Sequence, residues 1–312
     1  MIDVTDEMEK KPLIEQRADP YVYYHTDGYY YFVASVPEYD RIELRRAWSI
    51  AGLEKAQPFT IWRKHATGPM SGFIWAPELH YINGRWYIYF AAGQAEDTWY
   101  IRTWVLENTS PDPFCGQWEE KGMVVSEWDS FMLDMTVFEN KGQLYGIWAQ
   151  KAKEATENSR LYLAKMRNPY TVESPITEIS CPEYDWECKG FKVNEGPAVL
   201  KKNGRIFVTF SASATDATYC MGLLYADENA DLTDKKSWTK VKEPVLITDA
   251  KKGIFGPGHN SFTSTRDRKE DILIYHARPY AEVDLDFALF DPNRHTWVKK
   301  ISWDSKGFPV FQ

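Results

Sequence analysis

The chain has 312 residues and a formal net charge of −8 at pH 7, with 44% hydrophobic and 15% aromatic residues. The acidic balance, without a dense cluster of lysine or arginine, argues against a nucleic-acid partner and against a polyanionic one. No run of 18 apolar residues is present, so we expect no membrane-spanning helix. A neutral ligand fits the charge best.

One segment type recurs along the chain: a turn with a glycine, followed by a short strand rich in aromatic and β-branched residues. The copies lie at residues 27–33, 83–90, 141–148, 203–210 and 271–276, the last without the glycine. Their glycines, at positions 28, 84, 142 and 204, are 56, 58 and 62 residues apart. Asn-Gly and Asp-Gly favour hairpin turns, because both central residues need a positive φ.

Two further strand series follow each copy. The second series comprises residues 42–46, 100–104, 161–164, 221–225 and 287–290, and the third is marked by Trp62, Trp118, Trp238 and Trp297. Units of about 60 residues with several short strands and an aromatic motif are typical of propellers. We therefore predict an all-β, five-bladed β-propeller with four-stranded antiparallel blades around a central channel, a single domain over residues 1–312. A two-sheet sandwich does not explain the period. Residues 301–311 are expected to close the ring by pairing with the N-terminal blade.

An ionisable residue precedes each repeated hairpin at a similar distance. These residues are Asp19, Glu78, Asp134, Glu195 and His259. The inner ends of propeller blades converge on one axis, so we expect them to face a common chamber. Like charges in one chamber raise the pKa of at least one carboxyl group, which is typical of acid/base chemistry. Glu78 has the shortest offset from its glycine, and a strand-anchoring role stays open for it.

Aromatic side chains near these acids favour a carbohydrate as the neutral ligand. Trp75 lies three residues before Glu78 and is expected to form a wall of the sugar pocket. Trp128 fits either the pocket rim or the core, and the small residues 211–213 either leave pocket space or simply fill a strand.

Six motifs together resemble glycoside hydrolase family 43, and the resemblance covers nearly the whole chain. They are residues 17–20 (RADP), 75–78 (WAPE), 131–134 (FMLD), 194–197 (NEGP), 256–261 (GPGHNS) and 276–279 (HARP). The resemblance implies a five-bladed propeller that hydrolyses O-glycosyl bonds with inversion of configuration. It also implies a neutral oligosaccharide or polysaccharide as substrate.

The resemblance also implies roles for single residues. Asp19 would be the general base, Glu195 the general acid, and Asp134 the residue that orients the acid and raises its pKa. Substrate-binding roles would fall to Trp75, Arg278 and His259, with Arg278 contacting the terminal sugar. His259 would lie in the central channel, beside a structural calcium or sodium ion or a water molecule. The chemistry itself would require no cofactor.

Residues 39–46 and 50–53 resemble the branch that contains α-L-arabinofuranosidases. We therefore expect an exo-acting enzyme that releases arabinose from arabinan, arabino-oligosaccharides or arabinoxylan. A β-xylosidase of the same family and a non-catalytic carbohydrate-binding propeller are the alternatives. A retaining family would show an Asn-Asp-Pro-Asn-Gly block where this chain has only 18–20 (ADP), and no sialidase-type Asp-box turns are visible.

The cysteines and the N-terminus bear on the compartment. None of the four cysteines has CxxC spacing, and Cys181 with Cys188 fits either two free thiols or a disulfide. The first residues contain no apolar leader segment, which favours a cytoplasmic protein, with a secreted or periplasmic form lacking its leader as the alternative. The sequence does not indicate an oligomeric state.

Overall fold

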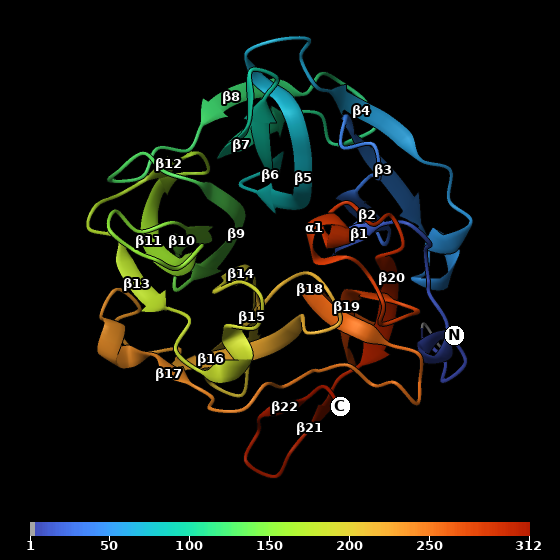
Figure 1. The fold of residues 1–312 in the computed structure, drawn as a ribbon. Helices are drawn as coiled ribbons and strands as arrows, with labels where there is room; N and C mark the ends of the chain where they lie inside the picture. Colours follow the sequence, from blue (N-terminus) through green and yellow to red (C-terminus); the bar gives the residue numbers. More distant parts are fainter. Residues whose placement is uncertain (1–3) are drawn as a thin grey trace.

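Five antiparallel sheets stand around a central axis in the computed structural model, which describes residues 4–312 (Figure 1). The first blade contains β1 (Ala18–Tyr24), β2 (Tyr30–Ser35), β3 (Arg41–Ala47) and β4 (Phe59–Arg63). The second contains β5 (Pro69–Ile82), β6 (Arg85–Gln94), β7 (Asp97–Asn108) and β8 (Glu119–Met123). The third contains β9 (Met132–Asn140), β10 (Gln143–Gln150) and β11 (Arg160–Asn168), with β12 (Thr171–Val172) and β13 (Thr177–Ser180) both paired to β11.

The fourth blade contains β14 (Asn194–Lys202), β15 (Arg205–Ala212), β16 (Cys220–Asp227) and β17 (Thr239–Lys240). The fifth contains β18 (Phe255–Ser264), β19 (Asp271–Arg278) and β20 (His295–Lys300). The predicted all-β, five-bladed propeller is thus confirmed. One short helix, η1 (Met8–Lys10), precedes β1, and the others lie between strands: η2 (Ala51–Glu54), η3 (Asp185–Glu187), η4 (Lys235–Ser237) and α1 (Leu285–Ala288). Among the described residues, no helix has the length and apolar character needed to cross a bilayer.

The N-terminal segment closes the ring on the fifth blade. The Leu13 amide donates to the Thr296 carbonyl at 2.8 Å, and the Thr296 amide donates to the Ile14 carbonyl at 2.8 Å. This antiparallel bridge adds a short fourth edge beside β20. A segment from the start of the chain therefore completes the last blade.

The prediction that residues 301–311 pair with the N-terminal blade is wrong. Their strands β21 (Ser302–Trp303) and β22 (Pro309–Val310) pair only with each other. Trp303 and Phe308 pack against Phe207, with ring centroids 5.8 and 5.6 Å apart. Trp303 and Phe308 are partly buried against the core cluster of blades four and five, which holds the hairpin away from the first blade.

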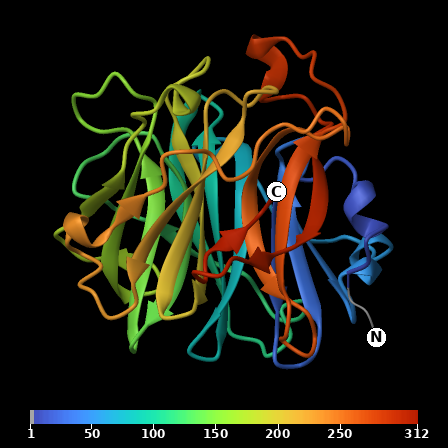
Figure 2. The ribbon, with the colours of Figure 1, turned by 90° about the horizontal axis from the view of Figure 1, so that it is seen from below.

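The prediction of a strand at residues 287–290 is wrong. These residues lie in α1 and the turn after it. Asp284 caps this helix, since its side chain accepts a hydrogen bond from the Asp286 amide. The third strand of the fifth blade is β20, so Trp297 does not match Trp62 of β4. The connection from β19 to β20 projects from one end of the propeller (Figure 2).

Two of the repeated turns have the backbone that their Asn-Gly sequences predict. Asn83 and Gly84 have φ values of 50° and 81°, and Asn203 and Gly204 have 53° and 72°. Lys141–Gly142 adopts the same pair of positive φ values, 52° and 78°, although lysine is unusual there. These tight hairpins connect the two innermost strands of blades two, three and four.

The hydrophobic core is divided among the gaps between neighbouring blades. Tyr31 and Val33 of the first blade pack with Trp86 and Ile88 of the second, and similar clusters fill the other gaps. Each such side chain contributes about 1.5–3 kcal/mol when fully buried. The aromatic residues of the repeat thus hold the blades together, and the axial ends of the strands remain available for polar groups.

Candidate active site

A residue with a positive φ interrupts the innermost strand of every blade at the same point. These residues are Asp19 (53°), Ala76 (45°), Asp134 (55°), Gly196 (54°) and His259 (41°). The pairing of each strand with its neighbour shifts register there, as expected for a β-bulge. Such a conformation is strained for residues other than glycine, and strain of this kind concentrates at functional sites. The bulges re-aim side chains at the channel end of each blade.

The positions of these bulges explain which of the expected ionisable residues lie together. Asp19, Asp134 and His259 occupy bulge positions, and Glu195 directly precedes Gly196. All four line one cavity. Glu78 does not line it: the bulge of the second blade is Ala76, eight residues before Gly84, and Glu78 lies beyond it. Glu78 is buried, with Oε2 2.9 Å from His80 Nε2, so it has the anchoring position that its short offset left open.

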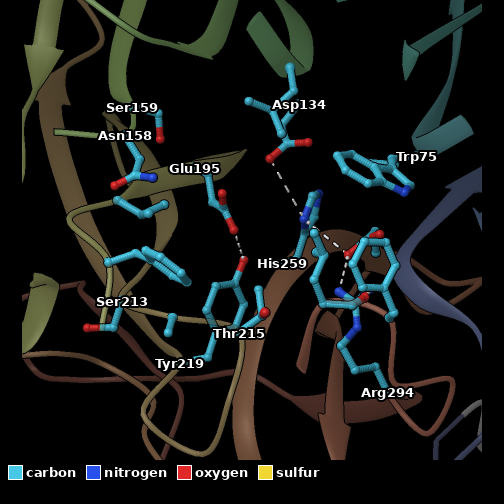
Figure 3. Close-up of a pocket in the computed structure, with 18 of the residues that line it drawn as sticks. Trp75, Asp134, Asn158, Ser159, Glu195, Ser213, Thr215, Tyr219, His259 and Arg294 are labelled. Carbon is cyan, nitrogen blue, oxygen red and sulfur yellow. Dashed lines mark hydrogen bonds and ion pairs between the residues drawn. The ribbon is translucent and has the colours of Figure 1, made fainter. Parts of the chain in front are cut away.

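The cavity has a volume of about 450 Å³ and takes residues from all five blades. Its acidic end is surrounded by apolar walls that include Trp75, Phe131, Leu133 and Phe290. The Trp75 ring stacks on Phe73 at 4.8 Å and borders the cavity as expected. Figure 3 shows Asp134 and Glu195 on one side of His259, with Trp75 and Arg294 on the other.

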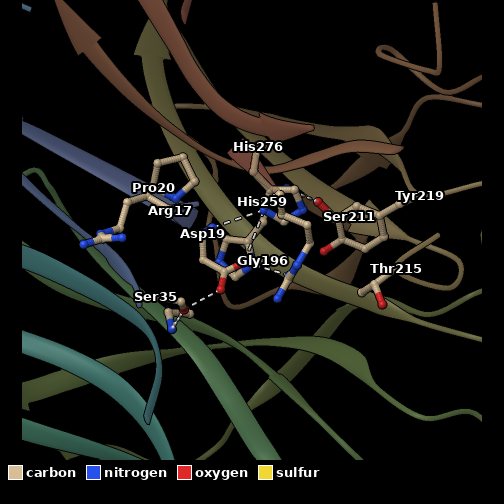
Figure 4. A network of polar contacts seen from close by, with 12 residues as sticks. Arg17, Asp19, Pro20, Ser35, Gly196, Ser211, Thr215, Tyr219, His259 and His276 are labelled. Carbon is tan, nitrogen blue, oxygen red and sulfur yellow. Dashed lines mark hydrogen bonds and ion pairs between the residues drawn. The ribbon is translucent and has the colours of Figure 1, made fainter. Parts of the chain in front are cut away.

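Asp19 is held by positive and neutral donors (Figure 4). Its Oδ1 atom lies 3.3 Å from His259 Nδ1 and 3.5 Å from Arg294 Nη1. Its Oδ2 atom accepts a hydrogen bond of 2.5 Å from Ser35 Oγ, and its amide donates to His276 Nδ1 at 3.1 Å. Burial raises the pKa of Asp19, but His259 and Arg294 outweigh it and hold that pKa well below the usual range. Asp19 is therefore ionised.

Glu195 has the opposite environment. Its Oε1 atom accepts a hydrogen bond of 2.7 Å from the Tyr219 hydroxyl. Burial and the negative charge of Asp134 raise the pKa of Glu195 to about 7. Burial also raises the pKa of Asp134, to about 6, although His259 counteracts it. Of the two neighbouring acids, Glu195 holds its proton to the higher pH.

His259 lies between the carboxylates. Its amide donates to Ser211 Oγ at 2.7 Å, and its Nδ1 atom lies 3.3 Å from Asp19 and 3.9 Å from Asp134. Burial lowers the pKa of His259, but the two carboxylates raise it above the ordinary value. A Cβ atom on Gly196 would lie 3.1 Å from the His259 ring, so glycine allows this close approach.

The surroundings of His259 do not fit a directly coordinated calcium ion. Calcium takes six to eight oxygen ligands, whereas the imidazole Nδ1 atom here faces the nearest carboxylates. Within residues 4–312, no group of three or more His, Cys, Asp or Glu side chains is arranged to hold a metal ion. The cysteines of that range are all free thiols.

The expectation that Arg278 contacts the sugar needs correction, because Arg278 does not line the cavity. Its side chain is 1% exposed, and its Nε donates to Asp291 at 2.7 Å. The other two guanidinium nitrogens donate to the carbonyls of Thr215 and Ala288. Every guanidinium nitrogen therefore has a partner within the protein. The arginine that lines the cavity is Arg294.

Sequence reasoning missed Arg294 and Tyr219. Arg294 lies directly before β20. Because the sequence pattern placed this strand at residues 287–290, it did not indicate that Arg294 faces the cavity. Tyr219 immediately precedes the repeated strand β16, and that position was its one signal. Among the residues left open, Trp128 packs on Tyr162 and donates to a backbone carbonyl instead of lining the cavity, whereas Ser213 lines it.

The chain is similar to proteins of one family. The model of "Glycosyl hydrolases family 43" matches residues 9–309. A Streptomyces avermitilis protein named extracellular exo-α-(1→5)-L-arabinofuranosidase is 52% identical over 300 residues, which cover 96% of this chain and 62% of that protein. A Streptomyces chartreusis protein of the same name is 54% identical over 274 residues, covering 88% and 84% of the two chains.

The fold comparison agrees with the sequences. The crystal structure of an α-L-arabinofuranosidase from Lactobacillus brevis superposes with a TM-score of 0.96 at 49% identity, covering 99% of this chain and 98% of that one. The family model, these relatives and the shared propeller lead to one assignment. The chain belongs to family 43 of the glycosyl hydrolases.

Proposed function

We propose that the protein is an inverting, exo-acting α-L-arabinofuranosidase that releases terminal arabinose from (1→5)-linked arabino-oligosaccharides. The observation that carries the chemistry is the opposite pKa displacement of two carboxyl groups lining one cavity. One of them, Asp19, is ionised, and the other, Glu195, keeps its proton until the pH approaches 7. General base and general acid catalysis require this combination.

In the proposed reaction, the Asp19 carboxylate removes a proton from a water molecule that attacks the anomeric carbon. Glu195 donates its proton to the glycosidic oxygen as the bond to the leaving sugar breaks. Because Glu195 Oε1 accepts from the Tyr219 hydroxyl, the transferable proton belongs on Oε2. Tyr219 thus orients the acid.

Asp134 serves the acid and does not react itself. Its negative charge raises the pKa of Glu195, and its Oδ2 atom accepts from the Gly196 amide at 3.0 Å, which holds the backbone beside Glu195. Arg294 and His259, whose own pKa is raised, keep Asp19 ionised. The five bulges place these groups around one sugar.

Two observations support the substrate and the exo action. Leu289 and Phe290 of the β19–β20 connection form part of the cavity wall, which suits a terminal sugar. The relatives named arabinofuranosidases are about half identical to this chain. The chain spans only 62% of the length of the Streptomyces avermitilis relative.

The test is hydrolysis of (1→5)-α-L-arabinotriose followed by proton NMR. Arabinose and arabinobiose should appear first, and the first arabinose should have the β configuration, because a single displacement by water inverts the anomeric centre. First-formed α-arabinose would require a covalent intermediate and contradict Asp19 as base. Release of xylose from a β-D-xyloside, with no turnover of the arabinoside, would favour a β-xylosidase.

A further inference from the structure

A buried cluster of polar side chains adjoins the proposed general acid without lining the cavity. Asn194, the residue before Glu195, and Glu187 are both fully buried. Lys240, on the outermost strand of the same blade, directs its ammonium group at Glu187, with Nζ 2.6 Å from Oε1. The proposed chemistry uses none of these three groups. Burying an ion pair costs desolvation energy, which makes a purely stabilising role a weak explanation for it.

Glu187 is the centre of this cluster. Its Oε1 atom accepts from Lys240 Nζ and, at 2.9 Å, from Asn194 Nδ2. Its Oε2 atom accepts from the amides of Glu183 and Tyr184, both at 2.8 Å. A buried carboxylate is tolerated only when its oxygens are paired in this way. The four donors therefore fix the carboxylate, and the carboxylate fixes the Asn194 side chain.

Asn194 is held at its backbone as well as at its side chain. Its Oδ1 atom accepts a hydrogen bond of 2.6 Å from Ser180 Oγ. Its backbone amide donates to the Ser159 carbonyl at 3.2 Å, and its carbonyl accepts from Ser159 Oγ at 3.0 Å. Gly196, on the other side of Glu195, has the positive φ of the bulge. The backbone of Glu195 is thus fixed from both sides.

The Glu195 carboxyl group makes one hydrogen bond of its own. Among the described residues, its partner is the Tyr219 hydroxyl (Figure 3). The position of the carboxyl group therefore depends on the backbone that carries it. We propose that Glu187, Lys240 and Asn194 are positioning residues that hold Glu195 within hydrogen-bond reach of the glycosidic oxygen. The proposal rests on the proposed function, because proton transfer from a general acid requires that reach.

The test compares kcat on two substrates whose leaving groups differ in their need for a proton. The sugar released from (1→5)-α-L-arabinobiose leaves as an alcohol and needs one, whereas 4-nitrophenolate leaves readily without it. Asn194→Ala should lower kcat on arabinobiose about tenfold and kcat on 4-nitrophenyl α-L-arabinofuranoside less than about threefold, because only the first depends fully on acid catalysis. KM for both substrates should stay unchanged.

The ion pair supplies a second test. Lys240→Met should show the same selective loss, because it leaves the Glu187 carboxylate buried without its cation, whereas Lys240→Arg keeps a cation and should restore turnover of arabinobiose. Lys235→Met is the matched control, because Lys235 pairs with Glu178 at 2.7 Å with 64% of its side chain exposed. It should leave both substrates unaffected. Asn194→Ala, which keeps the ion pair, decides the proposal if Lys240→Met does not fold.

Glu195→Ala separates the two proposals. It should lower kcat far more on arabinobiose than on the nitrophenyl glycoside, as the loss of a general acid predicts. If it does, and Asn194→Ala lowers both rates equally or neither, the positioning proposal falls while the proposed function stands. If Glu195→Ala lowers both rates equally, Glu195 is not the general acid, and the proposed function falls together with the positioning proposal.

Discussion

Asp19 and Glu195 are carboxyl groups that line one cavity, and their neighbours separate their chemistry. Asp19 is surrounded by His259, Arg294 and His276, whereas the neighbouring charge that most affects Glu195 is the anion of Asp134. Burial raises the pKa of both groups, and the neighbouring charges then move the two values apart. Division of labour between two similar side chains therefore arises from placement.

Removing either group should abolish most of the activity. Asp19→Ala and Glu195→Ala should each lower kcat on arabinobiose by at least about 100-fold, because general acid or base catalysis contributes about 10²–10⁴-fold. Circular dichroism should confirm that each variant is folded. A folded variant with near wild-type turnover would refute the role assigned to the replaced residue.

The pH dependence should report the pair of acids. We expect kcat/KM to fall as the pH rises through about 7, where Glu195 loses its proton. Asp134→Asn removes the negative charge that disfavours the Glu195 anion, so the pKa of Glu195 should fall and the alkaline limb should move to lower pH. An alkaline limb that stays in place would show that Asp134 does not set this pKa.

At the scale of secondary-structure elements, the site depends on bulges and on one long connection. The bulge in each innermost strand turns one residue toward the channel end, and the β19–β20 connection covers that end. Arg278 joins this connection to the β15–β16 loop, because it contacts Ala288 and Asp291 of the connection and Thr215 of the loop. It is a positioning residue for the cavity wall.

Arg278→Lys should therefore loosen the wall without removing a reacting group. Lysine keeps a charge for Asp291 but cannot reach both carbonyls, so the free energy of unfolding should fall by about 1–3 kcal/mol. KM for arabinobiose should rise several-fold, with a smaller change in kcat. Arg63→Lys is the control, because Arg63 is 64% exposed on β4. Unchanged stability and KM in Arg278→Lys would contradict this role.

The same scale shows what local patterns predict well. The Asn-Gly turns and the aromatic strands that follow them appear where the repeat placed them, since a hairpin is decided by residues close in sequence. The short distance in sequence from Glu78 to Gly84 was also a local signal. It separated Glu78 from the residues that line the cavity. Residues 287–290 were misassigned, because their apolar pattern resembles a short strand and the Asp284 cap that begins a helix there was overlooked.

For the whole molecule, the raised pKa of Glu195 implies a cost in stability. A carboxyl group whose pKa is raised on folding stabilises the folded state while it is protonated. This contribution is lost as the pH rises from 4.5, the pKa of the group in the unfolded chain, to about 7, its pKa in the folded protein. The active site thus opposes folding at neutral and alkaline pH.

Glu195→Gln should remove this cost. The variant should match the wild type in urea unfolding near pH 4 and gain stability over it as the pH rises, by up to about 3 kcal/mol at pH 8. Glutamine keeps an oxygen for the Tyr219 hydroxyl, so the contact at that atom is retained. A difference that does not change with pH would show that the Glu195 anion is not destabilised by folding.

The sequence by itself determined the five-bladed architecture, which follows from a repeat of about 60 residues, and the catalytic candidates Asp19, Asp134 and Glu195, which follow from that repeat together with the family resemblance. Only the tertiary structure decided that Leu13 and Ile14 close the ring on Thr296, and that Arg294 lines the cavity in place of Arg278. These features depend on contacts between residues far apart in the chain. A local pattern reports the backbone that carries a side chain, whereas its partners are set by how the blades pack around the axis.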